Sequence, residues 1–380
     1  MKIVFLSNYY NHHQAYLSRK LYELTGGAYR FIAATPLSED RRNLGYPELN
    51  DGFVTVYDAE NKDIREWIDT ADAVICGSAP EAWIENRKKS GKLIFRYSER
   101  PLKNGFQLWK YPYRLYQFRK RNPKKAKIYL LCASAYAAED YARFGLFRGK
   151  SFKWGYFPEC RQYENIEELI SKKTKNEILW CGRFLDWKHP DDVLTVAKRL
   201  RDEGVSFHVN VIGSGEMESA LKELCDQYGL AGCVTFLGAV SADEVREYME
   251  KAAVYLFTSD RKEGWGAVLN EAMNSGCAVV ASSAAGSTPY LINDGENGIV
   301  YAFGDTEHLY RSVKELLENQ GLRTSLGARA YETIVKEWNA EIAAERFIRL
   351  ASMLFSEEKD QELYINGPCS REKGGVSYGN

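Results

Sequence analysis

The stretch AVYLFTSDRKEGWGAVLNEAMNSGCAVVASS, residues 253–283, decides the fold of this 380-residue chain. Its two apolar runs, 253–259 and 277–281, have the length and composition of buried strands. Between them, the segment 267–276 places apolar residues at helical spacing and ends in glycine, as a helix with a C-terminal cap does. A strand, a loop, a helix and a further strand in immediate succession predict parallel strands joined by a helical crossover.

Similar apolar runs occur along the whole chain, separated by segments of helical period such as 189–204, 216–230 and 241–252. The further runs that we predict to be strands are 2–7, 29–34, 72–77, 92–97, 127–134, 176–182, 207–215, 233–240 and 297–301. Near-continuous apolar strands with helical connections are typical of parallel sheets covered on both faces. Two such series predict an α/β protein with two doubly wound, Rossmann-like domains.

The polar and charged segment 158–175 marks the expected break between the domains. We therefore assign residues 1–165 to an N-terminal domain and residues 166–337 to a C-terminal domain. A last helix is expected over 338–355. The segment 356–380 is polar and contains glycine, so it is predicted to be a disordered tail.

The composition excludes several classes of protein. A net charge of −1 gives no overall attraction to nucleic acid, so no nucleic-acid partner is expected. The eight cysteines include no CxxC pair and the five histidines no HExxH pattern, which favours reduced thiols in a cytoplasmic protein over disulfides or a zinc site. The longest run with little polarity, 128–138, is far shorter than a membrane span.

Two glutamates in the opening stretch, Glu263 and Glu271, lie on either side of a glycine-rich helix start. Gly264 and Gly266 allow a close backbone approach and positive φ there, and the free N–H groups of a first helical turn attract an anion. For either glutamate alone, a solvated side chain on a strand-to-helix connection is the simpler interpretation. The glycines and a second charged cluster favour a bound phosphate with a carboxylate on each side.

That second cluster is WCGRFLDWKHPDDVL, residues 180–194, where Arg183 and Lys188 follow a predicted strand. Open α/β sheets bind ligands at the carboxyl ends of their strands, and Arg and Lys there can neutralise a diphosphate. The alternative is two surface cations, with Lys188 paired to Asp186 or Asp191.

A third feature, VIGSGEMES at 211–219, is similar to a dinucleotide-binding fingerprint, but Glu218 stands at the third glycine position. That difference weakens the case for a nicotinamide enzyme and favours a tight turn before a helix.

These segments lead to a resemblance. GRFLDWK (182–188), IGSGEMESALKELCDQYGLAGCVTFLGAV (212–240) and EGWGAVLNEAMNSGCAVVASSAAGSTPYLINDGENGIVY (263–301), in this order, resemble the C-terminal domain of retaining glycosyltransferases, nearest to family 4 of the GT-B enzymes. The two glutamates match the E-x7-E motif of that family. The resemblance spans about residues 177–302. It implies two Rossmann-like domains facing across a cleft, with a C-terminal helix, here KEWNAEIAAERFIRL, that crosses back to the N-terminal domain.

The resemblance also implies catalytic roles. Arg183 and Lys188 match the pair that neutralises the nucleotide diphosphate, and Glu263 matches the glutamate that holds hydroxyls of the donor sugar. Cations and a helix start can stabilise the leaving diphosphate without a metal, so no metal site and no cofactor are expected. A retaining enzyme of this kind is thought to react on one face of the sugar within an ion pair, so no covalent nucleophile is named.

The remaining donor contacts follow from the same resemblance. Gly266, Ala267 and Val268 match amides near the distal phosphate, Glu271 matches the residue that binds the ribose hydroxyls, and Val240 lies in the region that contacts the base. The implied donor is a nucleotide sugar, with UDP-sugar expected ahead of GDP-sugar.

The N-terminal half departs from the family pattern. Where many members have a glycine-rich loop after the first strand, this chain has His12 and His13, which could bind a phosphate or an acceptor hydroxyl. A capping or surface histidine pair is the alternative. A later position that often holds a functional histidine has Glu99 and Arg100 instead, and these are our further candidates for the acceptor side.

A basic and aromatic segment follows, because no acidic residue occurs from Arg100 to Ala138. Its candidate membrane-contacting cations are Lys110, Arg114, Arg119, Lys120, Arg121, Lys124 and Lys125. Cations with Tyr and Trp suit an anionic membrane surface. The helical period is weak and Pro112 interrupts it, so a clean amphipathic helix is not established. A solvated basic face and an RNA-binding patch are the alternatives.

The sequence thus predicts a retaining, metal-independent glycosyltransferase of hexosyl type. It would transfer a sugar from a nucleotide donor to a carbohydrate or lipid-linked acceptor in bacterial surface polysaccharide assembly, in the cytoplasm or at the inner face of the membrane. A GT-B nucleotide-sugar epimerase and a non-catalytic protein that binds membrane or a partner are the alternatives.

Overall fold

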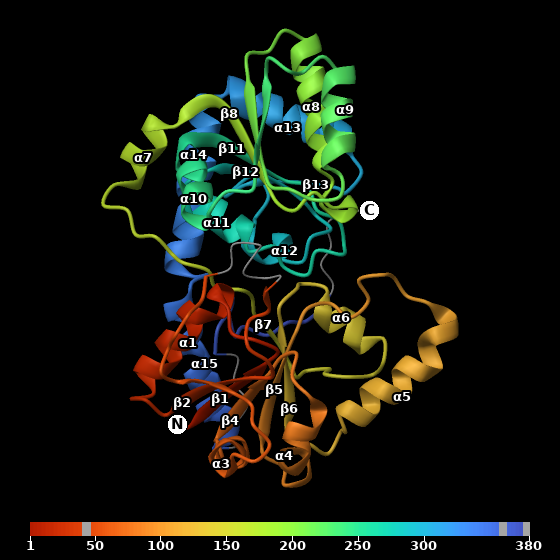
Figure 1. Cartoon of the computed structure of the whole chain (residues 1–380), viewed down its shortest axis with the longest axis vertical. Helices are drawn as coiled ribbons and strands as arrows, with labels where there is room; N and C mark the ends of the chain where they lie inside the picture. Colours follow the sequence, from red (N-terminus) through yellow and green to blue (C-terminus); the bar gives the residue numbers. More distant parts are fainter. Residues whose placement is uncertain (40–46, 357–362, 375–380) are drawn as a thin grey trace. The chain divides into compact units, whose positions relative to one another are not determined.

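The structure is a computed structural model that describes residues 1–39, 47–356 and 363–374 (Figure 1). It divides into two compact units. Among the described residues, unit 1 consists of Met1–Glu159 and the segments 338–356 and 363–374, and unit 2 is Cys160–Glu337. The division precedes the 165/166 boundary expected from sequence, because the polar segment after residue 160 is bonded to unit 2. The Arg161 amide donates to Asn274 Oδ1 (2.7 Å) and Tyr163 Oη donates to Glu250 Oε1 (2.6 Å).

Unit 1 contains one parallel sheet in the order β3-β2-β1-β4-β5-β6-β7. Its strands are β1 (Ile3–Ser7), β2 (Tyr29–Ala33), β3 (Val54–Val56), β4 (Ala73–Cys76), β5 (Leu93–Ser98), β6 (Ile128–Cys132) and β7 (Ser151–Lys153). Every run predicted as a strand in this half is confirmed. The two edge strands, β3 and β7, were missed because three residues carry too little pattern to recognise. The chain order reverses between β1 and β4.

Helices connect these strands. They are α1 (His12–Leu24), α3 (Lys62–Thr70), α4 (Glu85–Lys89), α5 (Tyr111–Arg121), α6 (Ala137–Ala142) and α15 (Ala340–Phe355), with 3-10 turns η1 (Glu81–Ile84) and η2 (Leu108–Lys110). The last helix, α15, packs beside α1. Its Phe347 ring lies 4.9 Å from Phe95 of β5 and 5.8 Å from Trp154, so α15 is part of the core of unit 1.

Unit 2 contains a second parallel sheet in the order β10-β9-β8-β11-β12-β13. Its strands are β8 (Thr174–Cys181), β9 (His208–Ile212), β10 (Val234–Gly238), β11 (Ala252–Phe257), β12 (Ala278–Ser282) and β13 (Ile299–Tyr301). All were predicted. Ile178, Val254 and Val280 are completely buried, as expected for central strands covered on both faces.

The helices of unit 2 return the chain from one strand to the next. They are α7 (Ile166–Lys172), α8 (Pro190–Asp202), α9 (Glu218–Gln227), α10 (Ala242–Lys251), α11 (Val268–Asn274), α12 (Thr288–Leu291), α13 (Thr306–Glu318) and α14 (Gln320–Lys336), with the 3-10 turn η3 (Asp186–Lys188). Their starts follow local sequence. Ser241 and Glu244, for example, form a capping box at the start of α10.

The prediction of a wholly disordered tail is wrong for residues 363–374. This segment runs antiparallel to β7, with Phe152 opposite Arg371. The Lys153 amide donates to the Ser370 carbonyl, and the Cys369 amide donates to the Lys153 carbonyl, both at 2.8 Å. The edge strand β7 supplies unpaired backbone groups that this polar segment satisfies, which composition alone does not reveal. The rest of the tail, 357–362 and 375–380, lies outside the described residues.

Within the described ranges, no helix has both the length and the apolar composition that crossing a membrane requires.

Candidate functional site

The sheet of unit 2 changes direction between β8 and β11. From β8 the chain adds β9 and β10 on one side, and from β11 it adds β12 and β13 on the other. The loops that leave the carboxyl ends of β8 and β11 therefore diverge, and open α/β sheets bind ligands at such a point. Arg183 and Lys188 follow β8, and Glu263 follows β11, so the structure brings the three predicted catalytic residues to this switch point.

The loop after β8 is held by the turn after β9. The amides of Gly182 and Phe184 donate to the carbonyls of Ile212 (3.0 Å) and Ser214 (2.9 Å). A Cβ atom on Gly213, where φ is +137°, would lie 1.9 Å from the Gly182 carbonyl oxygen. The glycines of VIGSGEMES thus form a tight turn, as the sequence indicated, and their role is close packing of two loops.

Arg183 is left exposed by this packing. Its neighbour Phe184 is buried, which fixes the loop. The Arg183 guanidinium has no hydrogen-bond or ion-pair partner among the described residues, so it is available to an anion at the carboxyl edge of the sheet.

Lys188 forms an ion pair with Glu263, and only 14% and 13% of the two side chains are exposed. Ser259 Oγ donates to the same carboxylate oxygen (3.2 Å). Behind the pair, Trp180 Nε1 donates to Thr258 Oγ1 (2.9 Å), which donates to the Lys188 carbonyl (2.6 Å). These bonds link the loops that follow β8 and β11.

The alternative in which Lys188 pairs with Asp186 or Asp191 is not what the structure shows. Asp186 pairs instead with Lys262 (3.1 Å). The Asp260 amide also donates to the Trp187 carbonyl (2.8 Å), which adds a backbone link between the same two loops.

A buried tryptophan, Trp265, supports the start of α11. Gly266 has φ of +87°, and a Cβ there would lie 2.3 Å from Phe257 Cζ, so only glycine fits. The ring of Trp265 is fully buried, and its Nε1 donates to Asn270 Oδ1 (2.8 Å). The expected positive φ is confirmed for Gly266 but not for Gly264. Trp265 and Asn270 were not predicted to support this loop, although a Gly-Trp-Gly sequence was visible.

Ala267 and Val268 complete this helix start, with Ala267 at the N-cap of a helix only seven residues long. The dipole of so short a helix is small, so any phosphate there would depend mainly on individual amide groups and nearby cations.

Glu271 lies half-buried on α11, near the end of β8. Burial raises the pKa of the Cys181 thiol to about 12, with the negative charge of Glu271 adding to the rise and Lys188 opposing it. Glu271 and Lys188 thus act on the same group at the carboxyl end of β8, although Glu271 belongs to α11, which follows β11, and Lys188 to η3, which follows β8.

Val240 lies two strands away at the same edge. It is partly exposed between Gly238, whose carbonyl accepts the Gly213 amide (2.8 Å), and Ser241, the N-cap of α10. All predicted donor-side residues therefore follow strands of unit 2 at their carboxyl ends.

In unit 1, three of the acceptor candidates gather around a residue that sequence reasoning missed. The rings of His12 and His13 are 3.9 Å apart at the start of α1. His13 stacks on Tyr156 (5.9 Å), and Tyr156 Oη donates to Glu99 Oε1 (2.6 Å). Burial lowers the pKa of His12, which favours its neutral form. Glu99 also pairs with Lys103.

Arg100 contacts a different set of residues. Its Nε and Nη2 donate to the two carboxylate oxygens of Asp140 at 3.2 and 3.3 Å, and Asp140 is only 4% exposed. The guanidinium also lies 4.7 Å from the ring of Tyr136. Arg100 therefore anchors the loop after β5, and a role at an acceptor stays a prediction.

The basic segment forms η2, α5 and the loop after it. Pro112 does not interrupt the helix, as the sequence interpretation had it, because it occupies the first turn, where no intrahelical N–H bond is lost. Lys110 and Arg114 are partly exposed, whereas the other five predicted cations are exposed: Arg119, Lys120, Arg121, Lys124 and Lys125.

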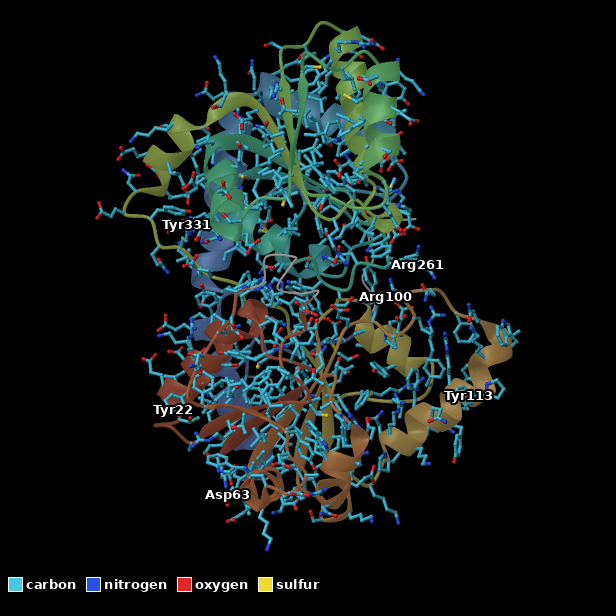
Figure 2. All side chains as sticks on the ribbon, in the orientation of Figure 1. Tyr22, Asp63, Arg100, Tyr113, Arg261 and Tyr331 are labelled. Carbon is cyan, nitrogen blue, oxygen red and sulfur yellow. The ribbon has the colours of Figure 1, made fainter. Side chains whose placement is uncertain are left out.

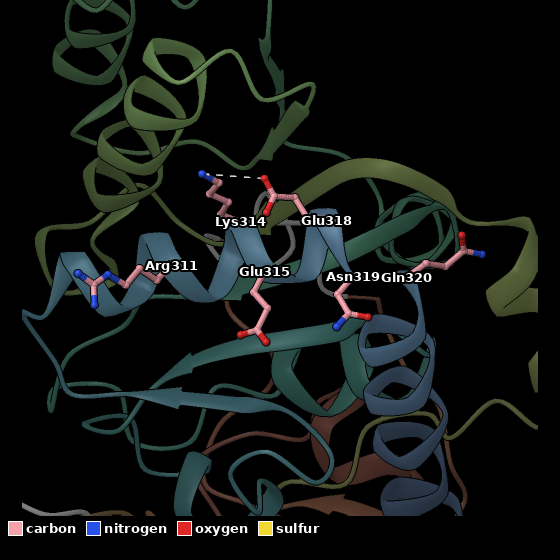
Figure 3. Close-up of a pocket in the computed structure, with 6 residues that line it drawn as sticks. All are labelled: Arg311, Lys314, Glu315, Glu318, Asn319 and Gln320. Carbon is pink, nitrogen blue, oxygen red and sulfur yellow. Dashed lines mark ion pairs between the residues drawn. The ribbon is translucent and has the colours of Figure 1, made fainter.

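A hollow of about 490 Å³ lies at the turn from α13 to α14 (Figure 3). Its cations are neutralised, because Arg311 pairs with Glu307 (2.6 Å) and Lys314 pairs with Glu203 (2.7 Å). Its lining residues belong to α13, the turn after it and the start of α14, and include none of the residues that follow β8 or β11, so it is not our candidate site.

Comparison with known proteins agrees with this location. Residues 162–333 match the model of the family described as Glycosyl transferases group 1. Unit 2 matches this family over almost its whole length.

Curated relatives match about half of the chain. A lipopolysaccharide core biosynthesis glycosyltransferase, LpsE of Rhizobium meliloti, is 28% identical over 173 residues, 46% of this chain and 48% of its own. A GDP-mannose-dependent mannosyltransferase of Mycobacterium tuberculosis is 24% identical over 175 residues, 44% of this chain and 45% of its own. The chain spans about half the length of the curated relatives it matches.

Solved structures match nearly the whole chain. Anabaena Alr3699/HepE in complex with UDP has a TM-score of 0.70 at 14% identity, covering 93% of this chain and 100% of its own. The lipopolysaccharide outer core galactosyltransferase WaaB has a TM-score of 0.67 at 17% identity, covering 94% and 100%. Identities this low show the fold alone, and the fold is GT-B, with two Rossmann-like domains.

Proposed function

We propose that this protein is a retaining, metal-independent glycosyltransferase that transfers a hexose from a nucleotide sugar to a carbohydrate acceptor. The observation that carries the proposal is the Lys188–Glu263 pair at the β8/β11 switch point, beside an Arg183 guanidinium with no partner among the described residues. The match of unit 2 to Glycosyl transferases group 1 supports it.

The chemistry follows from the charges of these side chains. Cleavage of the bond between the sugar and the diphosphate leaves negative charge on the departing phosphate. Arg183 and Lys188 would stabilise that charge in place, without a metal ion, with the amides of Gly266, Ala267 and Val268 at the distal phosphate. Glu263, held by Lys188 and Ser259, would accept hydrogen bonds from sugar hydroxyls.

Glu271 and Val240 would hold the nucleoside. A carboxylate accepts hydrogen bonds from both hydroxyls of a ribose, and Glu271 lies one helical turn beyond the proposed phosphate position. Val240 would contact the base. We propose UDP ahead of GDP. The structural match to a protein solved with UDP supports that choice, whereas the name of the mycobacterial relative specifies GDP-mannose.

Unit 1 would bind the acceptor. The cluster of His12, His13, Glu99 and Tyr156 combines hydrogen-bonding groups and flat rings, which suits a sugar with hydroxyls on its edge and C–H groups on its face. Names of relatives in lipopolysaccharide core, amylovoran and colanic acid biosynthesis support an acceptor in bacterial surface polysaccharide assembly.

A lipid-linked acceptor would be met at a membrane, and α5 is the element we propose to contact it. Trp109 in η2 and Tyr113 and Tyr116 in α5 are 76%, 68% and 61% exposed and recur at helical spacing. Figure 2 labels Tyr113 on α5. Tyr111 and Phe118, also in α5, pack against Phe144 at 5.4 and 4.9 Å. An exposed aromatic stripe flanked by cations suits the interface of an anionic membrane.

The transfer can be tested with rough-type lipopolysaccharide as the acceptor probe and UDP-glucose, UDP-galactose and GDP-mannose as donors. We expect release of a nucleoside diphosphate together with a glycosylated product whose new linkage keeps the anomeric configuration of the donor. Isomerised nucleotide sugar in the absence of acceptor would support an epimerase instead. Absence of nucleotide binding in calorimetry would support a non-catalytic protein.

A further inference from the structure

Besides the hollow at α13 in unit 2, the structure has a hollow of about 310 Å³ in unit 1. Its lining includes Ile128, the first residue of β6, and Lys150, which directly precedes β7. It therefore lies at the amino ends of these strands. His13 and Glu99 are at the carboxyl ends, so the hollow is not part of the proposed acceptor site.

The charge of this hollow is uncompensated. Lys124, Arg148 and Lys150 line it, and its lining contains no acidic residue. None of the three side chains forms an ion pair with a described residue. Lys150 Nζ lies 5.4 Å from the ring of Tyr129, whereas the Lys124 and Arg148 side chains make no hydrogen bond, ion pair or ring contact among the described residues. The hollow at α13 differs, because each of its cations is paired with a carboxylate.

The backbone of the wall supplies further donors. Gly145 and Phe147 line the hollow, and Gly149 lies between the lining residues Arg148 and Lys150; the three have positive φ, at 72°, 56° and 69°. Alternation of left-handed residues along a loop is the geometry of backbone nests that bind anions. The amides of Phe147, Arg148 and Gly149 donate to no acceptor among the described residues. The amides on either side do: Leu146 donates to Tyr141 O (3.2 Å) and Lys150 donates to Phe147 O (2.9 Å).

Phe147 is the unusual member of this loop. A left-handed conformation in a residue other than glycine is strained and persists only where its surroundings enforce it. Here the ring is buried against Tyr141 (5.3 Å). Together with Ile128 and Leu146, also buried, it forms an apolar floor beneath the cations.

We propose that this hollow binds the phosphate group of an ester whose other part is apolar. Lys124, Arg148 and Lys150 would bind the phosphate, the loop amides would donate to its oxygens, and the floor would contact the apolar part. A membrane phospholipid and a soluble phosphate ester share this chemistry. The inference does not rest on glycosyl transfer, because none of these residues belongs to the proposed donor or acceptor sites.

The test uses two probes on the full chain: hexyl phosphate in solution, and vesicles of phosphatidylglycerol compared with phosphatidylcholine. The variant is Arg148→Gln with Lys150→Gln. The matched control is Lys62→Gln with Arg65→Gln, which removes the same charge from exposed positions of α3 in the same unit. Circular dichroism and melting temperature check that both variants fold. If the Arg148/Lys150 variant does not fold, the single variant Lys124→Gln takes its place.

We expect the Arg148/Lys150 variant to bind at least one probe roughly tenfold more weakly than the wild type, as removal of two cations near a phosphate predicts, while the control is unchanged. Loss with hexyl phosphate identifies a soluble ester, and loss confined to phosphatidylglycerol vesicles identifies a lipid. Equal binding by variant and wild type, an equal loss in the control, or no binding of either probe by the wild type overturns the proposal.

Discussion

The ion pair between Lys188 and Glu263 is the residue-level feature that joins the two loops of the proposed donor site. The identities of Arg183, Lys188 and Glu263 could be predicted from their motifs. Their pairing could not, because Asp186 and Asp191 were nearer partners for Lys188 in sequence. The choice depends on the packing of two loops 75 residues apart. Tyr156 was missed for the same reason, since only the fold brings it to Glu99 and His13.

Arg183→Ala should separate activity from stability. We expect kcat to fall by roughly 10²–10³-fold, because a charge that stabilises the leaving group is lost. The free energy of unfolding should change by no more than about 0.5 kcal/mol, since the side chain is exposed and has no partner among the described residues. Steady-state kinetics and denaturant unfolding check this. Full activity of the variant would remove Arg183 from the mechanism.

Lys188→Ala is the comparison for that variant. It leaves Glu263 in a partly buried position without its cation, so we expect a loss of stability of about 1–3 kcal/mol as well as a loss of activity. A variant as stable as the wild type would show that the pair contributes little to the loops.

The proposed roles of Glu263 and Glu271 can be distinguished by comparing the binding of UDP with that of UDP-glucose. Glu271→Gln should weaken binding of both UDP and UDP-glucose, because both contain the ribose. Glu263→Gln should weaken binding of UDP-glucose but leave UDP almost unchanged, because only the sugar is affected. Isothermal calorimetry with each variant measures this, and the opposite pattern would exchange the two roles.

Asp192, in the first turn of α8, gives a prediction about pH. Burial raises the pKa of its carboxyl to about 6, with the negative charge of Asp191 adding to the rise. The folded protein then holds this proton more tightly than the unfolded chain does. Stability from this group therefore declines as the pH rises from about 4 to 6. Asp192→Asn should raise the melting temperature at pH 7.5 more than at pH 4. An equal effect at both values would contradict the assignment.

At the scale of elements, strand runs and helical segments were predictable because buried parallel strands are apolar throughout and their connections have helical period. The short edge strands β3 and β7 carried no such signal. The helical period of α5 was judged weak because its aromatic stripe faces outward. In most surface helices the apolar side chains face the core instead.

That stripe can be tested on vesicles. Trp109→Ser, Tyr113→Ser and Tyr116→Ser together should reduce binding to phosphatidylglycerol vesicles, because interfacial aromatics are lost while every cation stays. The control, Phe355→Ser with Ile365→Ser, removes exposed apolar side chains elsewhere in unit 1 and should bind as the wild type does. Unchanged binding of the triple variant in co-sedimentation would exclude α5 as the contact.

The segment beside β7 should contribute to the stability of unit 1. A chain ending at Phe355 exposes the backbone of β7, so we expect a lower melting temperature and more aggregation. A chain ending at Gly374 keeps the bonds between Lys153 and Ser370 and should match the full chain. Equal melting temperatures for both truncations would mean that the paired segment adds nothing.

At the scale of the whole molecule, the GT-B fold was predictable from the order of motifs in unit 2 and from the two series of strands. The placement of α15 in unit 1 agrees with the helix that this fold carries. Recognition of the acceptor could not be predicted to the same depth, because unit 1 lacks the motifs of the resemblance and assembles its cluster from residues 12, 13, 99 and 156.

The most direct test of the donor site is a crystal structure of the chain with UDP. We predict the diphosphate within about 3.5 Å of the Arg183 guanidinium and the Lys188 ammonium, with the ribose hydroxyls on the Glu271 carboxylate. UDP bound away from the carboxyl ends of β8 and β11, for example only in the hollow lined by Lys124, Arg148 and Lys150, would contradict the central claim.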